Sequence, residues 1–300
     1  MTSVLPASDA VGRDVVAAYR RNYGLGAEIG AEHVERHLAL EGELTRGLLA
    51  SAPADRWRTF SDAYTRLYQE LPWLNTPESP RSAAWLAAWA NLAPAGASVF
   101  EIGSGKAELL RFLLARGHPC VATEITAERG SKHLASADGL EWHSTDGVNL
   151  TAFEAPGSYD MVVSTQVIEH FHPADVATHF ANAHALLRAG GRYVFDTPHR
   201  ASGPHDLSRV FGMDSAAFMH LREYDWAEMR DFCRAADFAD VRAVLRIGRW
   251  ALPSRAYLAW LILIDAAERR FALSPRLRRQ WRRLGRYLLV PTNIWIVARK

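Results

Sequence analysis

The stretch VFEIGSGK at residues 99–106 decides the fold of this 300-residue chain. Its apolar half predicts a short buried strand, and Gly103 and Gly105 predict a tight turn. Residues 107–116 have the apolar spacing of an amphipathic helix, which Gly117 ends. Strand, glycine turn and helix form the first unit of a doubly wound α/β sheet. Because glycines let the backbone approach a ligand beside the positive end of a helix, the turn predicts a binding site.

Three features near this turn narrow the choice of ligand. Glu101 places an acid inside the strand, where its charge is costly to bury without a cationic or hydrogen-bonding partner. Glu108 stands where a dinucleotide-binding turn needs Gly or Ala, which disfavours a nicotinamide-dependent reductase. Glu124 ends the next strand, roughly 20 residues after the turn, where an acid binds ribose hydroxyls. With Glu108 in place of Gly or Ala, the turn does not suit a pyrophosphate, whereas Glu124 can still bind a ribose.

These motifs resemble those of the class I S-adenosylmethionine-dependent methyltransferases, whose first motif is an acid-x-G-x-G turn. The resemblance runs from about Ala84 to Ala243 and resumes in the last strand. It implies a Rossmann-like seven-stranded sheet, S-adenosyl-L-methionine as cofactor and a small-molecule acceptor. It also implies that Asp146, after the third strand, accepts the adenine amino group, although an Asp-Gly pair is also an ordinary turn. The expected cofactor-binding residues are Glu101, Gly103, Gly105, Glu124, Asp146, Gly147 and Gln166.

We expect three segments in the chain. Residues 1–97 have helical patterns without strand signals and predict an N-terminal helical cap. Residues 98–249 and 292–300 predict the Rossmann-like methyltransferase core, and residues 250–291 predict a basic helical insertion before the last strand. Aromatic residues gather near the end of the cap, either as core packing or as a lid over the methyl-transfer pocket. They are Trp57, Phe60, Tyr64, Tyr68 and Trp73.

Composition and charge exclude few classes of function. Hydrophobic residues make up 49% of the chain, enough for a substantial core, and the net charge is +2. Cys120 and Cys233 lie in apolar segments, which is typical of reduced core residues rather than of a disulfide or metal pair. The N-terminus lacks the features of a secretory signal, and the apolar run 256–264 is too short to span a bilayer. These features predict a cytoplasmic protein.

His170 is the expected catalytic residue. It follows the fourth predicted strand, residues 159–166, and an imidazole titrates near neutral pH. Because a hydroxyl acceptor needs a base, His170 favours O-methylation of a small-molecule, sugar or lipid-like acceptor. The alternatives are a histidine that is only structural and a transfer in which alignment alone supplies the rate.

A metal-dependent mechanism is a further alternative. The run 166–170, QVIEH, together with His220, resembles the metal site of the small-RNA terminal 2′-O-methyltransferases, which use E-x-x-E-H and a later His. Gln166 stands at the first acid of that motif, which removes one negative charge from a divalent site. We therefore predict no metal and keep the metal-dependent enzyme as an alternative. A non-catalytic cofactor-binding protein on the same fold is another.

The last part of the chain is strongly basic. Residues 242–300 carry 14 Lys or Arg and two acids, a net charge of +12. Within them, residues 276–284 place Leu and Trp at helical spacing among arginines. This pattern indicates either an Arg-rich solvated face or a surface for an anionic membrane or an acidic acceptor, so that the cytoplasmic protein would be peripheral to the membrane. No aromatic platform accompanies it, and we do not expect a nucleic-acid partner.

Overall fold

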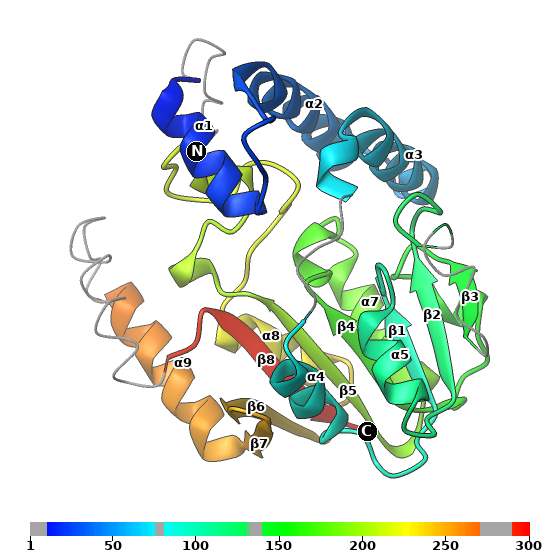
Figure 1. Ribbon diagram of the computed structural model, residues 1–300. Helices are drawn as coiled ribbons and strands as arrows, with labels where there is room; N and C mark the ends of the chain where they lie inside the picture. The colour runs from blue at the N-terminus through cyan, green and yellow to red at the C-terminus, as the bar shows by residue number, and fades with distance from the viewer. Residues whose placement is uncertain (1–10, 76–80, 131, 133–139, 271–289) are drawn as a thin grey trace.

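The computed structural model describes residues 11–75, 81–130, 132, 140–270 and 290–300 (Figure 1). Its centre is an eight-stranded sheet with the strand order β3-β2-β1-β4-β5-β8-β6-β7. The first five strands in this order run parallel, and β8, β6 and β7 each lie antiparallel to the strand before them. The strands are β1 (Val99–Ile102), β2 (Cys120–Glu124), β3 (Glu141–Ser144), β4 (Tyr159–Thr165), β5 (Leu187–Pro198), β6 (Asp240–Ile247), β7 (Trp250–Ser254) and β8 (Asn293–Arg299). The predicted α/β fold is confirmed.

The order of the strands reverses between β1 and β4. From β1 the chain continues into β2 and β3 on one side, and it then forms β4 and β5 on the other side of β1. Glu101 pairs with Ala122 of β2 and with Val163 of β4, so it lies in the middle of this reversal. In doubly wound sheets, ligands bind outside the carboxyl ends of the strands at such a point. The glycine turn after β1 therefore lies where the topology places a ligand.

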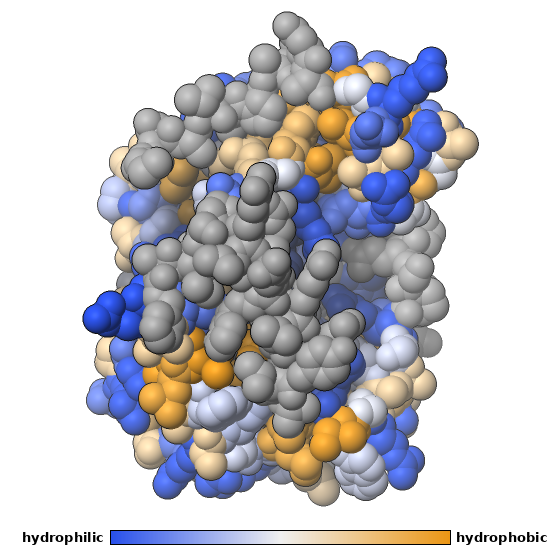
Figure 2. Space-filling model, turned by 90° about the vertical axis from the view of Figure 1, so that its left-hand side faces the viewer, coloured by the Kyte–Doolittle hydropathy of each residue, from blue (hydrophilic) through white to orange (hydrophobic). Residues whose placement is uncertain are grey.

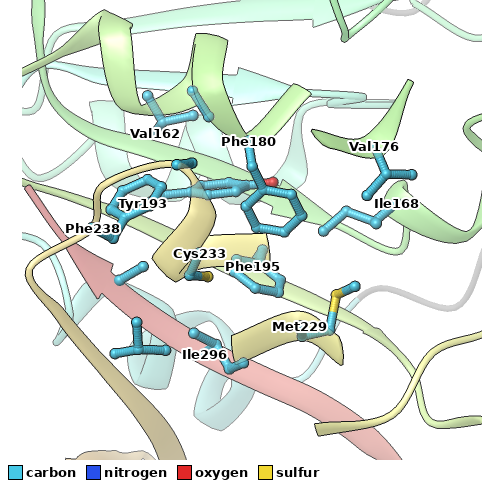
Figure 3. Packing of buried hydrophobic residues seen from close by; sticks show 14 of the residues in the cluster. Val162, Ile168, Val176, Phe180, Tyr193, Phe195, Met229, Cys233, Phe238 and Ile296 are labelled. Carbon is cyan, nitrogen blue, oxygen red and sulfur yellow. The ribbon is translucent and has the colours of Figure 1, made fainter. Parts of the chain in front are cut away.

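Helices cover both faces of the sheet. On one face lie α4 (Ala83–Ala90) and α5 (Glu108–Leu114), and Trp89 stacks on Trp295 of β8 with ring centroids 4.8 Å apart. On the other face lie α7 (Val176–Leu186), α8 (Trp226–Ala235) and α9 (Arg255–Arg270). Figure 3 shows the centre of this second layer, where the rings of Phe180 and Phe195 pack edge to face with centroids 5.3 Å apart. Cys233 lies there as a buried free thiol.

The sheet has one strand more than the seven predicted, and the expected helical insertion begins with that strand. β7 pairs with β6 through a tight turn at Gly248, whose φ of +59° suits glycine. The pairing satisfies backbone groups along the free edge of β6, which a helix at this place would leave exposed. The helix α9 follows at Arg255. The basic stretch 276–284 lies outside the described residues.

The N-terminal helices form a cap at the carboxyl ends of the parallel strands. The cap contains α1 (Arg13–Tyr23), α2 (Ala31–Ala50), α3 (Arg56–Glu70) and the short turn η2 (Pro72–Asn75), at the top of Figure 1. The loop between β5 and α8 belongs to the same layer, because Leu207 and Phe218 are buried against Tyr19 and Val34. The domain limits at residues 97 and 249 stay a prediction. No helix in the described ranges has the length and hydropathy needed to cross a membrane.

Candidate active site

A cavity of about 600 Å³ lies between the cap and the carboxyl ends of β1, β2 and β4. The loops after these strands form one wall, and α3 contributes Phe60, Tyr64 and Tyr68 to another. Three of the five aromatic residues that the sequence groups together therefore face the cavity. Trp73 packs inside the cap, and Trp57 packs against Phe153 with ring centroids 5.7 Å apart. The basic side chains in the wall are Arg81, Lys106, Arg111 and Arg129.

The glycine turn after β1 lies in the cavity wall and has no space for a side chain at its first glycine. Gly103 has a φ of +65°, and an added Cβ atom would stand 2.6 Å from a methyl carbon of Val167. Gly105 has a φ of +53°, and its N–H donates a hydrogen bond to the Glu124 carboxylate at 3.0 Å. Glycine is the residue that adopts this left-handed conformation without strain. Gly103 is thus required by its contact with Val167 as well as by its backbone, and Gly105 is favoured by its left-handed backbone.

Two of the predicted carboxylates stand at the ends of β2 and β3, on the same wall. Glu124 also accepts the N–H of Ile125, at 3.2 Å, so it joins the end of β2 to the glycine turn. Asp146 accepts the N–H groups of Val148 and Asn149, each at 2.8 Å, and therefore closes a turn of its own. Both residues line the cavity and are only partly buried, so their remaining lone pairs are open to a ligand.

The third carboxylate, Glu101, is buried and lacks a partner for one oxygen. Its side chain is 2% exposed, and Oε2 forms no hydrogen bond within the described part of the chain. Burial raises the pKa of Glu101 well above its usual value, the Glu124 charge adds to this rise, and Arg81 opposes it. A buried acceptor without a donor is costly, so this oxygen is suited to a hydrogen-bond donor or a cation.

Gln166 and Gly147 have contacts that the sequence does not predict. Gln166 has a φ of +55°, rare for a residue with a side chain, and its Nε2 donates to Asp196 at 3.0 Å. Gly147 has a φ of +69°, and an added Cβ atom would stand 2.9 Å from the ring of Phe171. Both line the cavity. The hydrogen bond of Gln166 and the close packing of Gly147 are thus contacts within the fold.

His170 lies in a short turn after β4, η4 (Ile168–His170), and lines the cavity. Its Nδ1 donates a hydrogen bond to the carbonyl oxygen of Met219 at 2.9 Å. Since a carbonyl only accepts, the proton of the neutral ring is on Nδ1 and the lone pair is on Nε2. Burial, and then the His220 ring, lower the pKa of His170 to about 3. The imidazole is therefore neutral at physiological pH, and its Nε2 lies 4.0 Å from Oε1 of Glu169.

Three potential metal ligands come together beside this ring. Glu169, His170 and His220 each offer one donor atom, and these atoms lie within 4.8 Å of one another. Oε2 of Glu169 accepts the hydroxyl of Thr197 at 2.9 Å, while its Oε1 has no hydrogen-bond partner among the described residues. Nδ1 of His220 pairs with Glu223 at 3.0 Å, and no described residue bonds to its Nε2. In each of the three residues, a hydrogen bond holds one polar atom of the side chain, and the other polar atom could bind a metal ion.

The sequence does not identify the residues that orient this group. Thr197 follows the acid that ends the predicted fifth strand, so its position at the strand mouth was a usable signal. Glu223 follows His220 at the spacing of one turn, which is a weaker signal. No sequence pattern predicts that the Met219 carbonyl contacts His170, because backbone geometry in a long loop depends on how that loop packs against the cap.

Comparisons with known proteins agree with this geometry. The sequence model of the methyltransferase domain family matches residues 76–243, more than half of the chain. The fold is similar to that of 1,6-didemethyltoxoflavin-N1-methyltransferase from Burkholderia thailandensis, with 17% identity, 83% of this chain and 91% of that chain covered, and a TM-score of 0.50. It is also similar to a SAM-dependent methyltransferase from Archaeoglobus fulgidus, with 15% identity, 72% and 92% coverage, and a TM-score of 0.51. No curated protein matches the chain significantly.

At these identities the two solved structures show a shared fold, and the family match carries the identification. The family match excludes the nicotinamide-dependent reductase, which Glu108 in the glycine turn also disfavours. The acid, the glycine turn and the strand-end carboxylates lie in one cavity at the topological reversal. The chain therefore belongs to the methyltransferase domain family and is a class I S-adenosylmethionine-dependent methyltransferase.

Proposed function

We propose that this enzyme methylates an oxygen atom of a small-molecule acceptor and that His170 accepts the proton. The observation that carries the proposal is the Nε2 of His170. It is unprotonated because Nδ1 is fixed on the Met219 carbonyl, and the ring stands in the wall of the cavity. The neutral imidazole presents a lone pair to the cavity. Because its pKa of about 3 makes it a weak base, it accepts the proton as the acceptor oxygen gains the methyl group and becomes acidic.

The cofactor belongs at the ends of β1, β2 and β3. The unpartnered oxygen of Glu101 is suited to the cofactor's ammonium group, and Glu124 and Asp146 are suited to the ribose hydroxyls and the adenine amino group. Gly103 supplies a close backbone approach because it has no side chain. When bound, S-adenosylmethionine supplies an electrophilic methyl group on a sulfonium sulfur. These residues hold the cofactor so that its methyl group is aligned with the acceptor.

The acceptor belongs between His170 and the aromatic side chains of α3. Phe60 and Tyr64 are 7% and 8% exposed, respectively, and they shield this side of the cavity from water. The ring of Tyr64 meets the ring of His170 edge-on, with centroids 6.0 Å apart, and so restricts its orientation. An acceptor with an apolar ring or chain next to its hydroxyl fits this wall.

Nuclear magnetic resonance of the product tests the choice of oxygen. The enzyme is incubated with S-adenosylmethionine labelled with ¹³C on the methyl group and with a metabolite extract of the source organism. We expect a new enzyme-dependent signal at the chemical shift of an O-methyl group. A signal at the shift of an N-methyl or C-methyl group would contradict O-methylation and leave the family assignment untouched.

A metal-dependent form of the same reaction is the second candidate. It is favoured by the three donor atoms of Glu169, His170 and His220 within 4.8 Å and by the unpartnered Oε1 of Glu169. Two imidazoles and one carboxylate suit a divalent transition metal, and three protein ligands leave positions open for an acceptor. When bound, the metal would supply a positive charge that lowers the pKa of an acceptor hydroxyl. Gln166 is held by Asp196 instead and would not act as a ligand.

Manganese binding separates the two candidates. If the group is a metal site, Mn²⁺ alone binds to the wild-type protein, as measured by calorimetry, and Glu169→Gln and His220→Ala each abolish binding. His143→Ala is the matched control, because this half-buried histidine pairs with Glu141 away from the cavity. If His170 acts only as a base, Mn²⁺ does not bind, and chelators leave turnover unchanged.

A further inference from the structure

Large exposed apolar side chains are concentrated in one short stretch of the chain. Among the described residues, seven large hydrophobic side chains are exposed, and five of them lie between residues 247 and 263. These five are called the apolar patch below. They are Ile247, Trp250, Leu252, Trp260 and Leu263, with exposed fractions of 58%, 54%, 50%, 43% and 64%, respectively.

The fold places the patch at one end of the sheet and along α9. In the edge hairpin, Ile247 pairs with Trp250 and Leu245 pairs with Leu252, so these side chains share one face. Ala251 points to the opposite face, where it packs with α4 and α5. The hairpin part of the patch is therefore on the face that α9 covers. Figure 2 views the side of the molecule on which α9 lies, and apolar surface shows in its lower half and again toward its upper right.

The helix α9 is attached to the protein by polar contacts on its inner side. Asp265 is buried, pairs with His199 at 3.0 Å and accepts the N–H of Trp226 at 3.0 Å. Arg269 pairs with Asp225 at 2.6 Å. The outer side is apolar instead, with Ala256, Ala259, Leu263 and Ala266 all exposed. A helix that only covers a sheet has polar residues on its outer side, so this outer side indicates an apolar neighbour other than the described residues.

Basic side chains surround the patch, and the nearby acids are engaged. The exposed arginines are Arg246, Arg249, Arg255, Arg269 and Arg270, of which Arg269 pairs with Asp225. The Arg249 guanidinium lies 5.0 Å from the ring centre of Trp250. Of the three acids in residues 240–270, Asp240 pairs with two arginines, Asp265 is buried and Glu268 is half-buried. Two copies of the chain would bring like charges together at this surface, which disfavours a dimer.

We propose that the apolar patch binds peripherally to an anionic lipid bilayer. Tryptophan and leucine side chains suit the boundary between headgroups and acyl chains, and arginines attract anionic headgroups. The patch comes from the edge hairpin and α9, which do not line the active-site cavity, so the inference does not depend on which atom the enzyme methylates.

Vesicle flotation with the full-length protein tests this proposal. Vesicles contain phosphatidylcholine alone or equal amounts of phosphatidylcholine and phosphatidylglycerol. We expect the protein to float with the anionic vesicles at low ionic strength only, because 1 M salt shortens the Debye length to about 3 Å. The triple variant Trp250→Ser, Leu252→Ser and Leu263→Ser should bind at least about tenfold more weakly. The matched control is Leu49→Ser with Phe153→Ser, which changes the other two exposed hydrophobic side chains and should bind like wild type.

Three outcomes would overturn the proposal. Wild-type protein that does not float with anionic vesicles at low ionic strength excludes a bilayer as the partner. A triple variant that floats as well as wild type shows that the patch is not the contact. A wild-type protein that forms dimers without lipid, and a triple variant that does not, would assign the patch to a second copy. Stabilisation of every variant by S-adenosylhomocysteine, measured in parallel, shows that the variants are folded.

Discussion

The two halves of the active-site cavity are built in different ways. In the cofactor half, polar contacts join residues close in sequence, as between Gly105 and Glu124 or between Asp146 and Asn149. In the acceptor half they join distant segments, as between His170 and Met219, 49 positions apart. The first half is built on the sheet and its turns, and the cap adds contacts such as the hydrogen bond from the Lys106 ammonium to the Asn75 carbonyl oxygen, at 3.1 Å. The second half exists only when the cap and the loop after β5 pack onto the sheet, so the two halves should respond independently to mutation.

The largest effect that we expect comes from Gly103→Val in the cofactor half. The new side chain would collide with Val167 and would adopt a φ that a β-branched residue disfavours, so the variant should lose stabilisation by S-adenosylhomocysteine completely. Thermal melting with and without S-adenosylhomocysteine measures this. Gly157→Val is the matched control, because Gly157 has a φ of +73° but open space around it. If both variants lose the stabilisation, backbone strain rather than the cavity is the cause.

His170→Ala should affect the other half of the cavity. Removal of a general base typically slows the chemical step by 10² to 10⁴-fold, and a loss of roughly this size is expected in single-turnover experiments. The affinity for S-adenosylhomocysteine should stay within about twofold, because the contacts of His170 lie on the acceptor side. Equal single-turnover rates in variant and wild type would remove His170 from the chemistry.

Glu101→Gln should separate stability from cofactor binding. Burial raises the pKa of Glu101, so the folded cofactor-free protein favours the protonated acid. Its contribution to stability is fully present below the unfolded pKa of about 4.3 and is lost as the pH rises through the raised folded pKa. The variant should therefore melt a few degrees higher than wild type, with a larger gain at pH 8 than at pH 5, while it binds S-adenosylhomocysteine more weakly. The exposed Glu141→Gln is the control, and an equal gain there would contradict this explanation.

Tyr64→Phe should have the smallest effect on the folded protein. The Tyr64 hydroxyl is buried and makes no hydrogen bond to any described residue, so its removal should leave the free energy of unfolding unchanged or raise it by up to about 1 kcal/mol. The control is Tyr193→Phe, whose hydroxyl bonds to Ser164 and to His179, each at 2.7 Å. That variant should lose about 1–3 kcal/mol in urea unfolding. A loss of similar size in Tyr64→Phe would indicate a partner for its hydroxyl.

The same contrast explains how much of the structure could be predicted. The strands, the glycine turn and the strand-end acids are local patterns, and the sequence predicts their place in the fold correctly. The eighth strand was missed because residues 250–254 form a strand only when the edge of β6 is available for pairing. The orienting contact of the Met219 carbonyl was missed because it depends on tertiary packing. Thr197 and Glu223 carried sequence signals, a strand end and a spacing of one turn from His220, but these signals alone do not identify a contact.

Calorimetric titration with S-adenosylhomocysteine tests the independence of the two halves most directly. The titrated proteins are wild type, Gly103→Val, and the double variant Glu169→Gln with His170→Ala. The double variant removes a carboxylate and an imidazole from the acceptor half. We expect the double variant to bind with an affinity within about threefold of wild type, because distant sites act additively, and Gly103→Val not to bind. Loss of binding in the double variant, or its retention in Gly103→Val, would contradict the division of the cavity into separate cofactor and acceptor halves.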